Sequence, residues 1–281
     1  MTGSPPTVLP LSLVFVVYRE ERLMARALES VAGLTDDILV IHDGPCPDRT
    51  LDIARSHGAR VYERDHAGYC EAHRIFAYDQ ACYDWVMQLD ADETLLPELK
   101  AALPHLLREP VGIYEISEPY PYRGKRYDGG FYKRSLYRKS AIRFTAMIHE
   151  SVQPRDARVQ IRRVDAPLIH DVQVDNLSVA GFRARVMRHI DMHARQLMQG
   201  YETFPHYGGV SASLQRLYAR RLAHPVLLGM VATPLYFTFV HVWKALRYRS
   251  LFYLRMNGLH VAYNLVLYAR IRSLKRQKRA G

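Results

Sequence analysis

Cysteine is scarce in this chain, which has three cysteines among its 281 residues. Cys46, Cys70 and Cys82 do not have the spacing of a metal-ligand motif, and their odd number argues against a framework of disulfide bonds. A protein with so few and so scattered cysteines fits a reducing compartment. We therefore predict a protein of the cytosolic side of the membrane.

Internal repeats are lacking, and low-complexity sequence is confined to the termini. The apolar run Leu11–Val17 is too short, and has the wrong flanking residues, for a signal peptide or a membrane span. With 48% hydrophobic residues, the chain can bury one sizeable core and append a small helical region.

Acidic residues are in the minority after residue 100. Residues 1–100 contain 9 Lys or Arg against 17 Asp or Glu, a balance of −8, whereas residues 101–281 contain 30 against 11, a balance of +19. A basic region of this size indicates an anionic partner, such as nucleic acid, phospholipid headgroups or a phosphorylated substrate. Because the basic residues flank apolar helices instead of alternating with aromatic residues on a sheet, we expect an anionic membrane surface and no nucleic acid.

Short apolar runs alternate with amphipathic segments over the first ninety or so residues. The pattern predicts strands at residues 11–17, 38–41, 59–63 and 84–89, and helices at residues 20–32, 48–56 (with Asp48 as N-cap) and 71–82. Strands separated by single helices imply right-handed crossovers and a mostly parallel sheet. In such sheets, ligands bind beyond the carboxyl ends of the strands.

Polar clusters follow three of these strands, at Tyr18-Arg19-Glu20, Asp43-Gly44 and Asp90-Ala91-Asp92. Side chains alternate along an extended segment, so Asp90 and Asp92 project to the same side. Two carboxylates in this arrangement can hold Mg²⁺ or Mn²⁺ and leave coordination positions open for the phosphates of a ligand. The alternative interpretation is an acidic turn between a strand and a loop.

The three clusters, taken in order with their neighbours, resemble the motifs of one enzyme family. They are Val16-Val17-Tyr18-Arg19-Glu20-Glu21, then Asp43-Gly44 with Asp48-Arg49-Thr50, then Asp90-Ala91-Asp92-Glu93. The family is the family-2 glycosyltransferases with a GT-A fold, and within it the lipopolysaccharide-core glucosyltransferases and related cell-surface polysaccharide enzymes are the most similar. The resemblance covers about the first hundred residues. Arg19 replaces the usual Asn, and Pro45-Cys46-Pro47 replaces the usual Ser-Thr stretch. These departures leave open which nucleotide base and which sugar the donor carries.

The resemblance implies an α/β fold of GT-A type, a Rossmann-like, mostly parallel sheet flanked by helices, with an apolar and basic helical extension at the C-terminus. It also implies a metal-dependent transferase that uses a nucleotide-sugar donor, UDP-linked by preference. Asp92 would hold Mn²⁺ or Mg²⁺, which would stabilise the charge on the leaving diphosphate, and Asp90 would lie near the ribose or the metal. His170 would complete the metal or diphosphate site, because imidazole suits Mn²⁺ better than Mg²⁺. A hydrogen-bonded core histidine is the alternative.

The same resemblance assigns residues to the nucleotide. Asp43 matches the family aspartate that binds the base, and Tyr18 and Glu20 lie beside the nucleoside pocket. Arg74, on the third predicted helix, is placed to meet a phosphate or the nucleotide, and its alternative role is that of a solvated arginine on a helix face.

Inversion at the anomeric carbon requires a carboxylate that accepts a proton from the acceptor hydroxyl. The segment Arg134-Ser135-Leu136-Tyr137-Arg138, followed by Ile148-His149-Glu150, resembles the arginine-rich strand and the His-Glu element of the surface-polysaccharide subgroup. We predict Glu150 as the base, with Asp128 in the loop Tyr127-Asp128-Gly129-Gly130 as the reserve candidate.

The C-terminal region is apolar and basic. Residues 225–240 carry no charge, and residues 251–269 are apolar but contain Arg255, Asn257, His260 and Asn264. A spanning hairpin would translocate Lys244 and two arginines against the positive-inside tendency, so we predict interfacial or re-entrant helices on anionic lipid. Packing on the catalytic domain or on a second copy in a homo-oligomer is the alternative. Before this region, residues 178–199 have the pattern of one amphipathic helix, with Ser178 as N-cap and Gly200 as stop.

These patterns predict three segments. Residues 1–105 form the nucleotide-sugar-binding half of a GT-A domain, residues 106–205 the acceptor-binding half, and residues 206–281 a membrane-associated helical region. The predicted function is inverting transfer of a sugar to a lipid-linked or lipopolysaccharide-type acceptor at the cytoplasmic face of the cell membrane. Two alternatives are a nucleotidyltransferase, for which a glycine- and lysine-rich loop near the first strand is expected, and a non-catalytic membrane-bound scaffold.

Overall fold

The computed structural model describes residues 8–127, 130–171, 178–200, 206–209, 212, 215–216, 219 and 226–280. Asp128, the reserve candidate for the base, lies outside these residues. The chain divides into two compact units. The first comprises residues 1–146, 150–173 and 206–209, and the second comprises residues 147–149, 174–205 and 210–281. The three functional segments that the sequence predicts stay a prediction.

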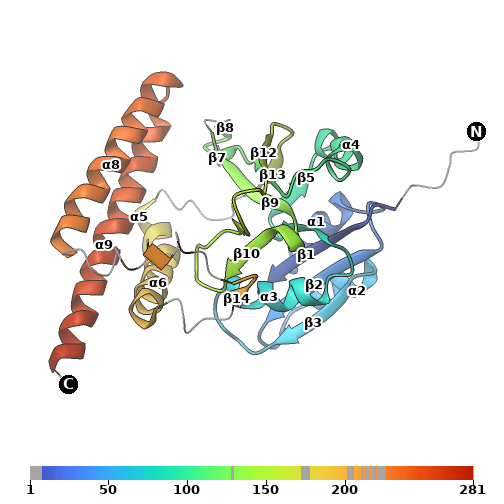
Figure 1. The fold of residues 1–281 in the computed structure, drawn as a ribbon, viewed down its shortest axis with the longest axis horizontal. Helices are drawn as coiled ribbons and strands as arrows, with labels where there is room; N and C mark the ends of the chain where they lie inside the picture. Colours follow the sequence, from blue (N-terminus) through green and yellow to red (C-terminus); the bar gives the residue numbers. More distant parts are fainter. Residues whose placement is uncertain are drawn as a thin grey trace, which may run out of the picture. The chain divides into compact units, whose positions relative to one another are not determined.

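The first unit is built on a sheet that has seven strands within the described residues, in the order β12-β6-β9-β4-β1-β2-β3 (Figure 1). These strands are β1 (Leu11–Val17), β2 (Asp37–Asp43), β3 (Arg60–Arg64), β4 (Trp85–Leu89), β6 (Ile113–Ser117), β9 (Tyr132–Arg138) and β12 (Ile161–Val164). All neighbours pair in parallel except β9, which is antiparallel to both β4 and β6. The carboxyl ends of the parallel strands and the amino end of β9 therefore share one edge, which we call the rim.

Helices cover both faces of this sheet, and the residues of β1 divide between them. Leu13 and Phe15 pack in the core with α1 (Met24–Ser30), α2 (Thr50–Ser56) and α4 (Pro97–Leu106). Val14 and Val16 pack in the opposite core with α3 (Glu71–Gln80) and β10 (Ile142–Thr145). Burial on both faces explains why β1 is an apolar run without the alternation of a half-exposed strand.

Short strands complete the first unit. They are β5 (Glu93–Leu95), β7 (Tyr120–Tyr122), β8 (Lys125–Tyr127), β11 (Gln153–Pro154), β13 (Leu168–His170) and β14 (His206–Tyr207), with a 3₁₀ turn at Lys139–Ala141. The pairing of β13 with β5 is antiparallel and sets His170 opposite Glu93. A segment that lies far along the chain is thereby brought to the end of β4.

The predicted strands and helices of the first ninety residues are found, with shifted helix starts. Helix α1 begins at Met24 and not at residue 20, because Arg19 has a left-handed backbone with φ of 58° and the Glu20 amide donates to Thr50 Oγ1 at 2.8 Å. Helix α2 begins at Thr50, and Asp48 Oδ1 accepts from the Thr50 amide at 3.0 Å. The predicted N-cap is therefore wrong by one residue, because Arg49 holds that position and Asp48 supports the start of the helix from the residue before it.

The second unit is helical within the described residues. Its elements are α5 (Val179–Gly181), a π-helical turn (Phe182–Val186), α6 (Met187–Gln199), α8 (Val226–Arg247) and α9 (Phe252–Ala280). Ser178 Oγ accepts from the Gly181 amide at 3.0 Å, and Gly200, with φ of 89°, ends α6, which confirms the predicted helix over residues 178–199. Helix α9 packs on both α6 and α8. Among the residues described, we find no helix with the length and apolar character that a bilayer crossing requires.

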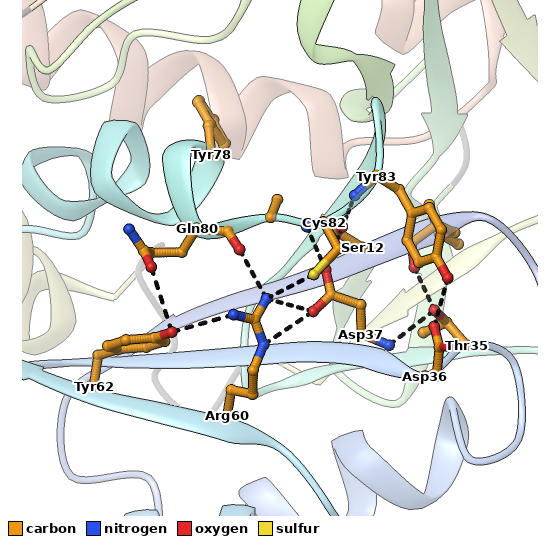
Figure 2. A network of polar contacts seen from close by, with 12 residues as sticks. Ser12, Thr35, Asp36, Asp37, Arg60, Tyr62, Tyr78, Gln80, Cys82 and Tyr83 are labelled. Atoms are coloured by element: carbon orange, nitrogen blue, oxygen red, sulfur yellow. Dashed lines mark hydrogen bonds and ion pairs between the residues drawn. The ribbon is translucent and has the colours of Figure 1, made fainter.

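A buried network fixes the sheet at the edge opposite the rim (Figure 2). Asp37, the first residue of β2, accepts from Ser12 Oγ at 2.5 Å and from the Cys82 amide at 2.8 Å. Arg60, the first residue of β3, donates to the same carboxylate from Nε at 3.1 Å and to the Gln80 carbonyl at 2.7 Å. One carboxylate thus joins β1, β2, β3 and the turn that leads into β4.

Replacing this carboxylate is expected to weaken the fold without touching the rim. Asp37→Ala removes the acceptor of three donors, and we expect the free energy of unfolding to fall by about 3 kcal/mol, because hydrogen bonds to a charged group contribute about 1.5–3 kcal/mol each and are not additive. Urea unfolding measures the change. The exposed neighbour provides the control, since Asp36 accepts a hydrogen bond from the Tyr83 hydroxyl at 2.8 Å and Asp36→Ala should cost about 1 kcal/mol or less.

The same network predicts a pH dependence. Burial raises the pKa of Asp37, but the bonds from Ser12, Cys82 and Arg60 outweigh it and hold this pKa below its ordinary value. The stabilisation is therefore present above about pH 4 and is lost as the pH falls further. Wild type and Asp37→Ala should converge in stability in acid, and a difference that stays constant down to about pH 2 would contradict this role.

Candidate active site

Acidic side chains meet at the rim. Asp90 and Asp92 follow β4, Glu93 begins β5, and Glu118 follows β6. Each is placed by a strand end, because parallel strands bring their carboxyl ends to one edge. Together these carboxylates would repel one another strongly unless cations lay among them.

Lys133 supplies one of these cations from the amino end of β9. Its Nζ donates to Asp90 Oδ2 at 2.8 Å and to Glu93 Oε1 at 2.6 Å. Glu93 has no exposed surface, and its second oxygen accepts from the Asp90 amide at 2.8 Å. The ammonium therefore ties the first aspartate of the Asp-Ala-Asp motif to the buried glutamate that follows it.

The charge state of this group follows from burial and from Lys133. Burial raises the pKa of Asp90, but Lys133 and Arg74 overcome it and lower this pKa to about 2. Burial raises the pKa of Glu93 to about 7, against the opposing effect of Lys133. Burial would lower the pKa of Lys133, and the neighbouring carboxylates raise it above its ordinary value. Asp90 is thus a fixed anion, and its side chain is 39% exposed, so a ligand can reach it.

His170 supplies the second cation, at the end of β13. Its Nδ1 lies 2.8 Å from Glu118 Oε1 and its Nε2 lies 3.2 Å from Asp92 Oδ2. Burial lowers the pKa of His170, but these two carboxylates raise it to about 10. Asp92 and His170 are therefore neighbours, as the predicted metal site requires.

The chemistry of these donors fits a divalent cation. A metal-bound histidine commonly gives its other ring nitrogen to a carboxylate, which fixes the tautomer and the ring orientation. Glu118 is in that position relative to Nδ1, which leaves Nε2 beside the Asp92 carboxylate. Metal binding would displace the proton that His170 otherwise carries. The donor atoms of Glu93, Glu118 and His170 also lie within 4.8 Å of one another. The residues fit Mn²⁺ or Mg²⁺ on Asp92 and His170, with Glu118 as the orienting group.

The nucleoside residues predicted from the sequence lie along the rim at β1. The ring of Tyr18 is 38% exposed, and its centroid lies 5.2 Å from that of His66 and 5.8 Å from that of His42. Glu20 lies in the turn before α1, and its amide is held by Thr50. An exposed aromatic ring among histidines is a surface on which a planar base can stack.

Asp43 lies at the end of β2, and its carboxylate already accepts hydrogen bonds from the protein itself. Its Oδ1 accepts from the Ala67 amide at 2.6 Å and from His73 Nε2 at 2.8 Å, and its Oδ2 accepts from the Gly68 amide at 2.8 Å and lies 3.2 Å from His66 Nδ1. Burial raises the pKa of Asp43, and these partners outweigh it and lower this pKa. The carboxylate organises the loop that leads into α3, and its contact with a base stays a prediction.

A cavity of about 460 Å³ opens beside Lys133. Its walls come from Arg74 of α3, Gln88 of β4, Glu115 and Glu118 at the end of β6, Tyr132 to Arg134 of β9, and residues 151–153. Glu150, the predicted base, immediately precedes this last wall and is half-buried. The residue before it, His149, has φ of 62°, a conformation that is uncommon outside glycine and often occurs at functional sites.

The structure thus brings Asp90, Asp92 and His170 to one place and sets Arg74 in the wall of the neighbouring cavity. Glu150 precedes the wall residue Ser151 in the sequence. Lys133 and Glu118 are members of the site that were not predicted from the sequence. A lysine inside a strand and a glutamate just after one carry no motif, and only the strand order sets them beside the Asp pair. The one feature of the sequence that could have indicated Glu118 is its place directly after a strand, where acidic residues of the site gather.

Comparisons with known proteins agree with this geometry. The model of Glycosyl transferase family 2 matches residues 12–168, which is more than half of the chain. An uncharacterized glycosyltransferase of Rickettsia typhi is 32% identical over 118 residues, which are 41% of this chain and 40% of that relative. A second one, from Rickettsia prowazekii, is 31% identical with the same coverage. The matched region thus spans about two fifths of the length of these relatives.

Among solved structures, the fold is similar to that of a mannosyltransferase from Pyrobaculum calidifontis in complex with GDP-Man and Mn²⁺. The superposition covers 95% of this chain and 88% of the other, with a TM-score of 0.51 and 12% sequence identity. The likeness extends to the fold, which confirms the predicted α/β class of GT-A type with a mostly parallel sheet flanked by helices and a helical C-terminal region.

Proposed function

The chain belongs to glycosyl transferase family 2, and we propose that it transfers a sugar, with inversion, from a UDP-linked donor to a lipid-linked or lipopolysaccharide-type acceptor. The observation that carries this proposal is the placement of Asp92 beside His170, with Glu118, which lines a cavity, on the other ring nitrogen. The structurally similar mannosyltransferase contains Mn²⁺ and a GDP-sugar, which supports a divalent cation and makes GDP the competing base.

Each residue of the rim has a defined task in this proposal. Asp92 and His170 hold the cation, which supplies Lewis-acid stabilisation of the leaving diphosphate when it is bound. Lys133 holds Asp90 and Glu93 in place beside the metal residues. Tyr18, with Glu20 and Asp43 nearby, receives the nucleoside.

Removing one charge at the metal position tests this assignment. Asp92→Asn should reduce Mn²⁺-dependent release of nucleoside diphosphate from the sugar nucleotide by about 100-fold or more, because loss of one group that stabilises transition-state charge typically costs that much. The measurement is turnover with UDP-sugars and GDP-sugars at saturating Mn²⁺, with circular dichroism to confirm folding.

The matched control is Asp52→Asn, which alters an exposed carboxylate on α2 that pairs with Arg55. This control should retain wild-type turnover. Normal turnover in Asp92→Asn would contradict the metal role of Asp92.

We assign the base to Glu150, which stands next to the cavity wall of residues 151–153. In a single displacement, the acceptor hydroxyl attacks the anomeric carbon, its proton passes to the Glu150 carboxylate, and the bond to the diphosphate breaks. Glu150 is half-buried, and a glutamate carboxylate can accept this proton as a general base.

Glu150→Gln separates binding from chemistry. The amide keeps the size of the side chain but cannot accept the proton, so transfer should fall by about 100-fold or more while donor affinity stays within about twofold. Transfer kinetics and calorimetric titration with the nucleoside diphosphate measure the two quantities. The control Glu98→Gln, at an exposed position in the first turn of α4, should behave as wild type. Unchanged transfer in Glu150→Gln would assign the base to another residue.

The proposed acceptor lies in a membrane, and the second unit offers a surface for it. Helix α8 exposes apolar side chains at helical spacing along one face. They are Leu228, Val231, Leu235, Phe239, Val242 and Leu246, of which Phe239 and Leu246 are each 75% exposed. Lys244, Arg247 and Arg249 follow at its end. An apolar face with basic residues at its end is the pattern of a helix that lies at the surface of an anionic membrane.

We propose that this surface binds the cytoplasmic leaflet of the membrane, and vesicle sedimentation measures that binding. Phe239→Ser should weaken binding to vesicles that contain anionic lipid by about tenfold, because burial of one aromatic side chain contributes about 1.5–3 kcal/mol. The control Val179→Ser removes a side chain that is 73% exposed at the start of α5 and should bind as wild type. Equal binding of both variants would contradict a membrane role for α8.

A further inference from the structure

Charged side chains of both signs line the cavity beside Lys133. Its lining includes three cationic side chains, Arg74, Lys133 and Arg134, and two carboxylates, Glu115 and Glu118. Lys133 is neutralised by Asp90 and Glu93. Arg134 Nε lies 3.1 Å from Glu115, and Glu118 is paired with His170. Arg74, the third lining cation, lies within electrostatic reach of Glu71 and Asp90.

Arg74 has one buried donor without an acceptor in the described part of the chain. Its Nε is buried and has no hydrogen-bond partner among the residues that the structure describes. The guanidinium carbon lies 6.0 Å from the centroid of the Phe144 ring. Buried polar atoms are almost always hydrogen-bonded, and a charged donor without an acceptor is costly. A buried Nε–H at the wall of a cavity is therefore a donor to which a ligand can supply an anionic acceptor.

The surroundings of Arg74 define which ligand supplies the anion. Eight of the ten lining residues come from residues 115–153, the part of the chain for which we predict acceptor binding, and the wall at residues 151–153 follows Glu150. Ser135, fully buried two residues after Lys133 on the same face of β9, has a hydroxyl without a partner within the described part of the chain. A planar guanidinium matches the geometry of a carboxylate or a phosphate.

We propose that Arg74 is the anion-binding residue of an acceptor subsite, and that the accepting sugar carries a carboxylate or a phosphate group. This inference rests on the proposed glycosyltransferase function. It also moves Arg74 from the donor nucleotide, where the sequence placed it, to the acceptor. The anion satisfies the buried guanidinium and thereby fixes the orientation of the sugar, so that one hydroxyl faces Glu150.

Binding of simple sugars to the full chain tests the subsite. The probes are glucose, glucuronate and glucose 6-phosphate, which share a ring and differ in charge and in the anionic group. Ligand-observed NMR titration should give at least one anionic sugar an affinity about tenfold or more above that of glucose, since a hydrogen-bonded charge pair contributes on that scale. The preferred anion distinguishes a carboxylate from a phosphate.

Variants then locate the preference. Arg74→Gln should abolish it, and Arg74→Lys should restore part of it by keeping the charge without the planar fork. The control is Arg64→Gln, which should retain the preference. This change removes a guanidinium whose carbon lies 4.3 Å from the ring centroid of Phe76, a residue of the same helix as Arg74. Urea midpoints of all variants confirm folding. Equal affinity for glucose and for both anionic sugars in wild type, or a preference that survives in Arg74→Gln, would overturn the proposal.

Titration with UDP and GDP in the presence of Mn²⁺, on the same preparations, separates this inference from the function on which it rests. Nucleotide affinity that is unchanged in Arg74→Gln supports an acceptor role. Loss of that affinity would assign Arg74 to the donor diphosphate and overturn the inference, while the proposed function would stand. Absence of nucleotide binding in wild type, together with a retained preference for anionic sugars, would contradict the proposed function and leave an anion site.

Discussion

The rim of the sheet depends on two cations that make a cluster of carboxylates possible. Asp90, Asp92, Glu93 and Glu118 converge there, and two ionised carboxylates in close contact oppose each other's ionisation. Lys133 binds the first and third of them, and the positively charged His170 lies between the second and the fourth. The arrangement resembles a site prepared for cations, in which the chain itself supplies part of the positive charge. A divalent ion on Asp92 and His170 would take the place of the His170 proton and leave Lys133 in position.

The topology of the sheet makes this arrangement possible. Parallel strands bring only their carboxyl ends to the rim, where loops place acidic side chains. Strand β9 runs in the opposite direction between β4 and β6, so its first residues, including Lys133, arrive at the same edge. The pairing of β13 with β5 then delivers His170. At the other edge, Asp37 and Arg60 hold the amino ends of the strands, which keeps the rim in register.

Most of the fold and part of the site could be predicted from the sequence. Apolar runs such as Leu11–Val17 and stop signals such as Gly200 are local, and the resemblance of the motifs at Asp43 and Asp90 gave the α/β class. The partners of those motifs could not be predicted in the same way. Lys133 lies 43 residues from Asp90, and their contact exists only because β9 is inserted between β4 and β6. Likewise, the occupation of Asp43 by its own loop depends on a chain path that no motif records.

We propose that Asp92 and His170 form a metal-dependent site for a nucleoside diphosphate. The decisive experiment is calorimetric titration of the full chain with UDP, GDP, dTDP and CMP, each with and without Mn²⁺. One diphosphate should bind, with UDP first in order, and its affinity should fall by at least about tenfold when Mn²⁺ is omitted. Binding that is equally tight without Mn²⁺, or no binding of any of the four nucleotides, would contradict it.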